Sequence, residues 1–302
     1  MNPAIEIRII MKKHYLFILL FTLTSALTAQ SKVLESLSMK SALLNTEVKY
    51  SIYLPDGYDS SERHYPVVYL LNGYTGNETD WIESGSMQHI VDHEIAEGNI
   101  QKMVIVMPDG DDRLYMNRTD GTYPYEDMFI KELLPYMESQ YRIRKGKRYT
   151  GISGLSMGGA GSLKLALKYD KTFGACAAFS AAVFTEEEVT ASDQDGMNGY
   201  VSKAMPDMVG KKGENRLNKS YEYYDVLHLV KTKDPVLLKT VKLYFDCGDD
   251  DFLTLGNAEL HKQLTLKQIP HEYRVRDGAH TWPFWRESLP IGLQFISDSF
   301  WK

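Results

Sequence analysis

The sequence predicts an α/β fold in which a mostly parallel β-sheet carries helices on both faces. Strand-like and helix-like segments alternate along most of the 302 residues, which is typical of parallel strands joined by crossover helices. Two strand-like segments, 66–71 and 103–107, are apolar throughout, as expected for strands buried on both faces. No repeat or low-complexity linker divides the chain after its first thirty or so residues, so we expect residues 33–302 to form a single domain.

The individual elements are assigned from local patterns. Residues 48–54 alternate polar and apolar side chains and stop at Pro55, which predicts the first strand. Apolar or small-residue runs predict the other strands at 66–71, 103–107, 148–152, 174–182, 241–246 and 272–275. Apolar residues at helical spacing predict helices at 81–96, 125–141, 157–169, 257–268 and 285–300.

Residues 185–234 interrupt this alternation. The stretch is rich in methionine and tyrosine, namely Met197, Tyr200, Met205, Met208, Tyr221, Tyr223 and Tyr224. It follows one expected central strand and ends before the next. We therefore interpret it as an insertion that lies over one end of the sheet, like a lid.

The N-terminal residues have the pattern of a secretory signal peptide at 11–29. Lys12 and Lys13 precede an apolar run at 15–23, and small residues follow up to Ala29, after which cleavage is expected. The apolar run is too short for a comfortable membrane span. The alternatives are a buried first helix and an uncleaved anchor. We expect a secreted or periplasmic protein with no membrane span in its mature chain.

Net charge and cysteine content limit the classes of partner. The formal net charge is −6, so the broad basic surface that nucleic-acid binding requires is not expected, whereas a neutral sugar or ester would not be repelled. Cys176 and Cys247 are the only cysteines, and both lie in apolar, strand-like runs, so we expect buried free thiols. The sequence does not indicate an oligomeric state.

A G-x-S-x-G motif at 154–158 carries the clearest chemical signal. A predicted strand precedes it and a predicted helix follows it, which is the context of the nucleophile elbow in the α/β-hydrolase fold. The small residues at 158–161 suit such a tight turn, and the helix N-terminus would direct free N–H groups at developing negative charge. Ser156 is the predicted nucleophile. The alternative is a glycine-rich turn whose serine only caps a helix.

A serine nucleophile needs a histidine base and an acid that orients it, here in the chain order Ser, acid, His. Of the three histidines that follow strand 241–246, His261 falls in a predicted helix and His271 begins a strand. His280 lies in the loop between the last strand and the last helix, where sites occur, so we prefer it. The acid should follow strand 241–246. By residue type the candidates are Asp246, Asp249, Asp250 and Asp251, of which Asp246 lies within the strand. By position alone Asp250 and Asp251 are close rivals, and the acidic cluster could also be a solvated loop or a calcium site.

The oxyanion intermediate of such chemistry needs two backbone N–H donors. We assign one to Met157, directly after the nucleophile, and the other to Tyr74 in the loop 72–76, with Gly73 as the alternative donor and as a substrate contact. An ordinary β-turn would also explain this loop. Aromatic walls near the substrate site are predicted at Trp81, Trp282, Trp285 and Tyr74, and core packing would explain any one of them equally well. No metal or cofactor is expected.

Five segments resemble the esterase D-like family: YLLNGYTGNETDW, MPDG with the later Tyr125–Glu126, GLSMGGAG, CGDDDFL and GAHTWPFW. The resemblance extends from about residue 33 to 301, and the order and spacing of the segments agree with the family. That family includes feruloyl, acetyl-xylan and tributyrin-type esterases and S-formylglutathione hydrolases. The resemblance implies Asp251 as the acid, His280 as the base, and Tyr74 and Met157 as oxyanion donors. One departure is Asn72, because relatives often have histidine before this glycine.

The resemblance and the signal pattern together predict a secreted serine carboxylesterase. Its expected substrate is a small-molecule or oligosaccharide ester, either a feruloyl or an acetyl substituent of plant polysaccharide. Tyr221 and Tyr224 of the insertion are predicted to contact the acyl group, which favours feruloyl slightly. The alternatives are a general short-chain carboxylesterase, a thioesterase like S-formylglutathione hydrolase, and a carbohydrate-binding protein without activity.

Overall fold

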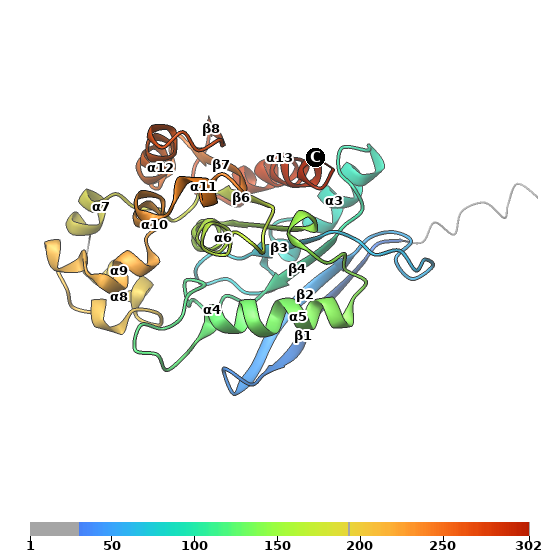
Figure 1. Cartoon of the computed structure of the whole chain (residues 1–302), viewed down its shortest axis with the longest axis horizontal. Coiled ribbons are helices and arrows are strands. Elements are labelled where there is room, and N and C mark those ends of the chain that lie inside the picture. The colour runs from blue at the N-terminus through green and yellow to red at the C-terminus, as the bar shows by residue number, and fades with distance from the viewer. Residues whose placement is uncertain (1–29, 193, 302) are drawn as a thin grey trace, which may run out of the picture.

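A computed structural model describes residues 30–192 and 194–301 (Figure 1). At its centre is an eight-stranded sheet with the order β1-β2-β4-β3-β5-β6-β7-β8. Strands β1 and β2 are antiparallel to each other, β2 is antiparallel to β4, and every pair from β4 to β8 is parallel. The expected α/β-hydrolase fold with its mostly parallel sheet is thus confirmed. The predicted signal peptide at 11–29 lies outside the described residues.

The strands are β1 (Lys32–Ser41), β2 (Thr46–Leu54), β3 (Val67–Leu71), β4 (Val104–Pro108), β5 (Thr150–Leu155), β6 (Ala175–Phe179), β7 (Lys242–Gly248) and β8 (Glu272–Arg276). The larger helices of the main body are α3 (Met87–Ala96), α5 (Leu134–Gln140), α6 (Ser156–Lys168), α12 (Thr254–Leu266) and α13 (Trp282–Ser299). Shorter helical segments of the main body are α2 (Asp80–Glu83), α4 (Tyr125–Met128), the π-helical turn η1 (Phe129–Leu133), the 3₁₀ turn η2 (Lys147–Tyr149) and α11 (Pro235–Leu238).

Helices cover both faces of the sheet because its central strands are apolar on both sides. In β3, Val67 and Tyr69 contribute to one hydrophobic core, whereas Val68 and Leu70 contribute to the core on the opposite face. Helices α3 and α13 pack together on the second face, and α6 and α12 lie on the first (Figure 1). The period of two along a strand thus explains how one apolar run supplies both cores.

Three local features differ from the sequence-based assignment. Strand β1 was not predicted, because it is an edge strand with mostly exposed side chains and no apolar run. The helix expected at 81–96 is split into α2 and α3 by a turn at Gly85, where a Cβ would lie 2.6 Å from the Trp81 carbonyl oxygen. The helix expected at 125–141 contains the turn η1 just before Pro135, a residue that lacks the N–H needed for regular α-helical bonding.

The insertion 185–234 is helical. It contains α7 (Glu186–Ala191), α8 (Gln194–Val201), α9 (Lys219–Tyr224) and α10 (Val226–Thr232), with two 3₁₀ turns, η3 (Pro206–Met208) and η4 (Gly213–Arg216). Cys176 and Cys247, in β6 and β7, are buried free thiols. Among the residues described, no helix has both the length and the apolarity needed to cross a bilayer.

Candidate active site

Ser156 occupies a tight turn between strand β5 and helix α6. Its φ of +53° is a left-handed backbone angle that few residues other than glycine adopt. A Cβ on Gly158 would lie 2.6 Å from the carbonyl oxygens of Leu71 and Asn72, and a Cβ on Gly154 would lie 2.7 Å from the Gly158 backbone. Glycine at these two positions therefore allows the close packing that holds the serine at the carboxyl edge of the sheet.

Ser156, His280 and Asp251 form one continuous chain of hydrogen bonds. His280 Nε2 lies 2.9 Å from Ser156 Oγ, and His280 Nδ1 lies 2.8 Å from Asp251 Oδ2. An ionised carboxylate only accepts, so the Asp251 contact places the imidazole proton on Nδ1 and leaves Nε2 to accept from the serine hydroxyl. The structure thus brings together the three residues predicted to carry the chemistry.

The carboxyl group of Asp251 is buried yet favours its ionised form. Burial raises the pKa of Asp251, but hydrogen bonds from His280, from the Leu253 N–H and from Ser180 outweigh burial and lower the pKa below its ordinary value. The Leu253 N–H donates to Oδ1 at 2.9 Å, so both carboxylate oxygens have partners. This arrangement fixes the orientation of the carboxylate toward the imidazole.

The rival acids and histidines are placed elsewhere. Asp246 is fully buried, but its carboxylate accepts from Arg276 at 3.1 Å. Asp250 is exposed on the loop after β7. His261 and His271 are paired with each other, with 2.8 Å between Nδ1 and Nε2. Position in sequence left Asp250 and Asp251 open, and the tertiary structure selects Asp251 as the residue that reaches His280.

Three acidic side chains near this loop are close enough to share a cation. Asp249, Asp250 and Asp277 each place a carboxylate oxygen within 4.8 Å of the others, and all three are exposed. Asp249 Oδ1 already accepts from the N–H groups of Asp250 and Gly278. These loop hydrogen bonds account for the arrangement, and we assign it no metal-binding role.

The loop after β3 lies against the nucleophile. A Cβ on Gly73 would be 3.7 Å from Ser156 Cβ. The Tyr74 N–H has no hydrogen-bond partner among the described residues, and the Met157 N–H lies in the first turn of α6, where helical amides lack partners. The predicted oxyanion donors thus belong to segments next to Ser156, because Tyr74 follows Gly73 in the loop packed against it and Met157 is its neighbour in the chain.

Asn72 holds this loop in place. Its side chain is buried and its Oδ1 accepts from the Gly110 N–H at 3.1 Å and from the Tyr115 hydroxyl at 2.8 Å. Its Nδ2 donates to the Gly73 carbonyl at 2.9 Å. The asparagine that departs from the family pattern thus ties the loop to a neighbouring segment and orients the peptide before Tyr74.

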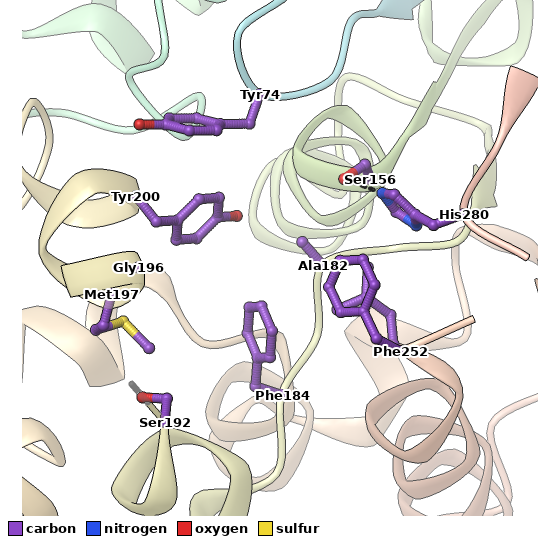
Figure 2. A pocket seen from close by; sticks show the side chains of 11 residues that line it. Tyr74, Ser156, Ala182, Phe184, Ser192, Gly196, Met197, Tyr200, Phe252 and His280 are labelled. Atoms are coloured by element: carbon purple, nitrogen blue, oxygen red, sulfur yellow. Dashed lines mark hydrogen bonds between the residues drawn. The ribbon is translucent and has the colours of Figure 1, made fainter. Parts of the chain in front are cut away.

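Two cavities meet at Ser156 and His280, and Tyr74 lies between them. The first, of about 480 Å³, has mostly apolar walls and is lined by Tyr74, Ser156, Ala182, Phe184, Ser192, Gly196, Met197, Tyr200, Phe252, Leu253 and His280 (Figure 2). The second, of about 530 Å³, is lined by Gly73, Tyr74, Thr75, Gly76, Asp80, Leu155, Ser156, His280, Thr281, Trp282, Pro283 and Trp285. We call them the insertion cavity and the loop cavity.

Comparison with known proteins agrees with this geometry. The sequence profile of the Esterase family matches residues 41–296, which is most of the chain. The chain belongs to the Esterase family. It is a serine carboxylic-ester hydrolase, as the family match and the acetyl esterase relative support.

Three relatives illustrate the similarity. The esterase is 27% identical over 245 residues to an acetyl esterase of Caldicellulosiruptor saccharolyticus, covering 79% of this chain and 86% of the relative. It is 30% identical over 146 residues to an endo-1,4-beta-xylanase/feruloyl esterase of Xylanibacter ruminicola, covering 46% of this chain and 20% of that longer protein. A solved ferulic acid esterase superposes with a TM-score of 0.76 at 29% identity, covering 89% of this chain and 99% of that one.

Two of the five predicted substrate contacts line the cavities of the esterase. Gly73 and Trp282 both line the loop cavity. Trp81 was predicted as a wall, but it is fully buried and its indole N–H donates to the Leu71 carbonyl at 3.0 Å. Tyr221 and Tyr224 line neither cavity, because both are buried in the packing of the insertion itself. The prediction was wrong for these three residues.

Besides Tyr74, three aromatic residues line the insertion cavity that were not predicted as contacts. They are Phe184, Tyr200 and Phe252. Phe252 directly follows the acid, and its ring centroid lies 4.7 Å from that of His280. Tyr200 had been noted only as one tyrosine of the insertion. Met197 and Tyr200 are three residues apart, so helical spacing in α8 places them on one face. This spacing is the sequence signal that could have identified both as cavity residues.

Ser180 and Trp285 contact Asp251 and His280 in the esterase. Trp285 Nε1 donates to Ser180 Oγ at 3.1 Å, and Ser180 in turn hydrogen-bonds the Asp251 carboxylate. The Trp285 ring also meets His280 edge-on at 4.8 Å. Ser180 has a φ of +43°, at the end of β6. No sequence motif indicates this serine, because its role depends on a turn that brings β6 beside β7.

Proposed function

We propose that this esterase is exported and hydrolyses ester substituents of plant polysaccharide or oligosaccharide. In this proposal a Ser-Asp-His triad acts through an acyl-enzyme, and the acyl group is feruloyl in preference to acetyl. The observation that carries the proposal is the pair of cavities that meet at Ser156. An ester bound across the serine can place its acyl part in one cavity and its alcohol part in the other.

The proposed chemistry follows from the positions of five residues. Ser156 Oγ attacks the ester carbonyl while His280 Nε2 takes its proton, and Asp251 stabilises the resulting imidazolium. The N–H groups of Tyr74 and Met157 bind the oxyanion. His280 then returns the proton to the leaving alcohol, and an acyl-serine remains. Water activated by the same imidazole attacks this intermediate and releases the acid and the free serine.

The insertion cavity supports an aromatic acyl group. Its volume of about 480 Å³ far exceeds the needs of an acetyl group, and three of its walls are the rings of Tyr74, Phe184 and Phe252. Planar aromatic acids pack well against such rings. Because one relative is named an acetyl esterase, acetyl is the alternative acyl group. The alternative activities are those of a general short-chain esterase and of a thioesterase.

The loop cavity supports a sugar as the alcohol. Trp282 is partly exposed there, and the Asp80 carboxylate, which can accept hydrogen bonds from sugar hydroxyls, lies beside it in the lining. A relative that is named both xylanase and feruloyl esterase agrees with a plant polysaccharide substrate. The signal pattern at 11–29 supports export, and N-terminal sequencing of protein from the culture supernatant or periplasm tests it, because a chain retained uncleaved in the cytoplasm contradicts export.

A panel of substrates tests the proposed acyl group. We expect kcat/KM for methyl ferulate and for feruloylated arabino-oligosaccharide to exceed that for methyl acetate and for acetylated xylan. Nitrophenyl acetate serves as the control for general esterase activity, since its activated leaving group makes few demands on the acyl cavity. Efficient hydrolysis of acetylated xylan with none of methyl ferulate would instead assign the esterase to acetyl substituents.

The pH dependence tests the proposed base. His280 must be neutral to accept the serine proton, so kcat/KM should rise with pH over the range from about 5 to 8 in which histidines change charge. The lowered pKa of Asp251 keeps that group ionised throughout this range, so one ionisation should describe the curve. Circular dichroism at each pH controls for unfolding. A flat profile between these limits is the result that contradicts a histidine base.

A further inference from the structure

Tyr200 brings a phenolic hydroxyl into the insertion cavity. Its ring lies between those of Tyr74 and Phe184, with centroid distances of 5.3 Å and 6.1 Å. Figure 2 shows the hydroxyl pointing toward the side of the cavity that holds Ser156. Burial raises the pKa of Tyr200 above that of an ordinary phenol, so this hydroxyl keeps its proton near neutral pH.

A relay of hydrogen bonds determines where that proton points. The hydroxyl of Tyr224 lies 2.8 Å from the carbonyl oxygen of Ala182, which can only accept, so the single phenolic proton of Tyr224 is used there. The hydroxyls of Tyr200 and Tyr224 are also 2.8 Å apart. Because Tyr224 has no second proton, Tyr200 is the donor in this contact. The Tyr200 oxygen is thereby left with lone pairs only, and it can act in the cavity solely as an acceptor.

We propose that Tyr200 is a specificity-determining residue that selects acyl groups bearing a hydrogen-bond donor, such as the free phenolic hydroxyl of a hydroxycinnamoyl ester. This inference rests on the proposed preference for aromatic acyl groups and restricts it to those that carry a hydrogen-bond donor. An acyl group with a methoxy group in place of this hydroxyl offers only an acceptor, and two acceptors cannot bond. The neighbouring walls, Ala182, Phe184 and Phe252, have no side-chain donor to compensate.

Tyr224 acts in this scheme as a positioning residue. It does not line the cavity, and its effect on the substrate passes through the direction of the Tyr200 proton. Removing the Tyr224 hydroxyl frees that proton, so Tyr200 can then donate to an acceptor in the cavity. A purely steric role for Tyr200 predicts no such effect, and this difference makes the two explanations separable.

The test compares methyl 4-hydroxycinnamate with methyl 4-methoxycinnamate in the purified esterase. We expect the wild-type kcat/KM to favour the hydroxy ester by roughly ten-fold, the scale of one hydrogen bond left unmade in an apolar site. Tyr200→Phe should lower this ratio to about two or less. Tyr224→Phe should lower this ratio as well. It should do so by raising kcat/KM for the methoxy ester, because the Tyr200 hydroxyl can then donate a hydrogen bond to the methoxy oxygen.

Tyr221→Phe is the matched control, because it removes a hydroxyl from the same tyrosine cluster. The Tyr221 hydroxyl is not part of the relay and instead contacts the Phe184 carbonyl at 3.4 Å. Its ratio should equal that of the wild type. Turnover of both esters with a ratio that Tyr200→Phe leaves unchanged would overturn the role of Tyr200 while keeping the proposed acyl class. If neither cinnamoyl ester reacts although nitrophenyl acetate does, the acyl class itself is wrong and this inference falls with it.

Discussion

Replacing Ser156 with alanine is expected to lower kcat for ester hydrolysis by roughly 10⁴- to 10⁶-fold, the cost of removing a triad nucleophile. The reason is geometric, because Ser156 Oγ is the group that lies 2.9 Å from His280 Nε2, and without it no acyl-enzyme can form. The fold should survive, since alanine removes one partly exposed oxygen from the turn. Turnover of methyl ferulate or nitrophenyl acetate, with the melting temperature measured in parallel, checks both expectations.

Ser153→Ala is the matched control for this change. Ser153 lies on strand β5, three residues before the nucleophile, and its buried hydroxyl has no hydrogen-bond partner among the described residues. Activity and labelling by a fluorophosphonate probe should persist in this variant and disappear in Ser156→Ala. If Ser156→Ala retained more than about a tenth of wild-type turnover, far above the residual activity of triad mutants, another group would have to be the nucleophile.

Asp251→Asn is expected to have the second largest effect, a loss in kcat of about 10⁴-fold. The amide is neutral and cannot stabilise an imidazolium, and its NH₂ group would favour the wrong tautomer of His280. The folded structure already contains the hydrogen bonds that lower the pKa of Asp251, so the ionised carboxylate is the form that the site is built to hold. The measurement is kcat for a single ester substrate, taken at the same pH for the variant and the wild type.

Asp250→Asn is the control for the acid, because it changes a neighbouring carboxylate that is exposed and does not face His280. Its kcat should remain close to that of the wild type. If the Asp250 variant lost more activity than the Asp251 variant, the loop after β7 would have to adopt another conformation in solution. The comparison therefore tests the turn itself as well as the role of the acid.

The insertion shows where reasoning from composition fails. Its tyrosines were expected to contact the acyl group because they are aromatic, yet Tyr221 and Tyr224 are 5% and 4% exposed and pack inside the insertion, whereas Tyr200 faces the cavity. All three share residue type and segment. They differ in the direction in which short helices present them, and that direction depends on how α8 and α9 pack against each other and on the Tyr74 hydroxyl that donates to the Gly199 carbonyl.

Trp81 gives the same lesson for the main body. It directly follows the loop that holds Tyr74, so proximity in sequence made it a candidate wall of the site. In the structure it is wholly buried and its ring packs against Phe179 and Trp282. Trp282, two hundred residues later in the chain, is the tryptophan of this pair that lines the loop cavity. The two tryptophan rings are in contact, and the one that is packed less deeply is the one that lines the cavity.

Local sequence patterns were enough to predict the fold class, and they also indicated a serine nucleophile followed by its acid and histidine partners. Apolar runs predict strands because a sheet covered by helices on both faces excludes most polar side chains. The serine between two glycines predicts the elbow because a larger residue at Gly158 would collide with the backbone of Leu71 and Asn72. The tertiary structure decided which aspartate reaches His280, how Ser180 and Trp285 support it, and which aromatic rings form the cavities. Those choices depend on contacts between segments distant in the chain, and local patterns of burial and spacing do not encode them.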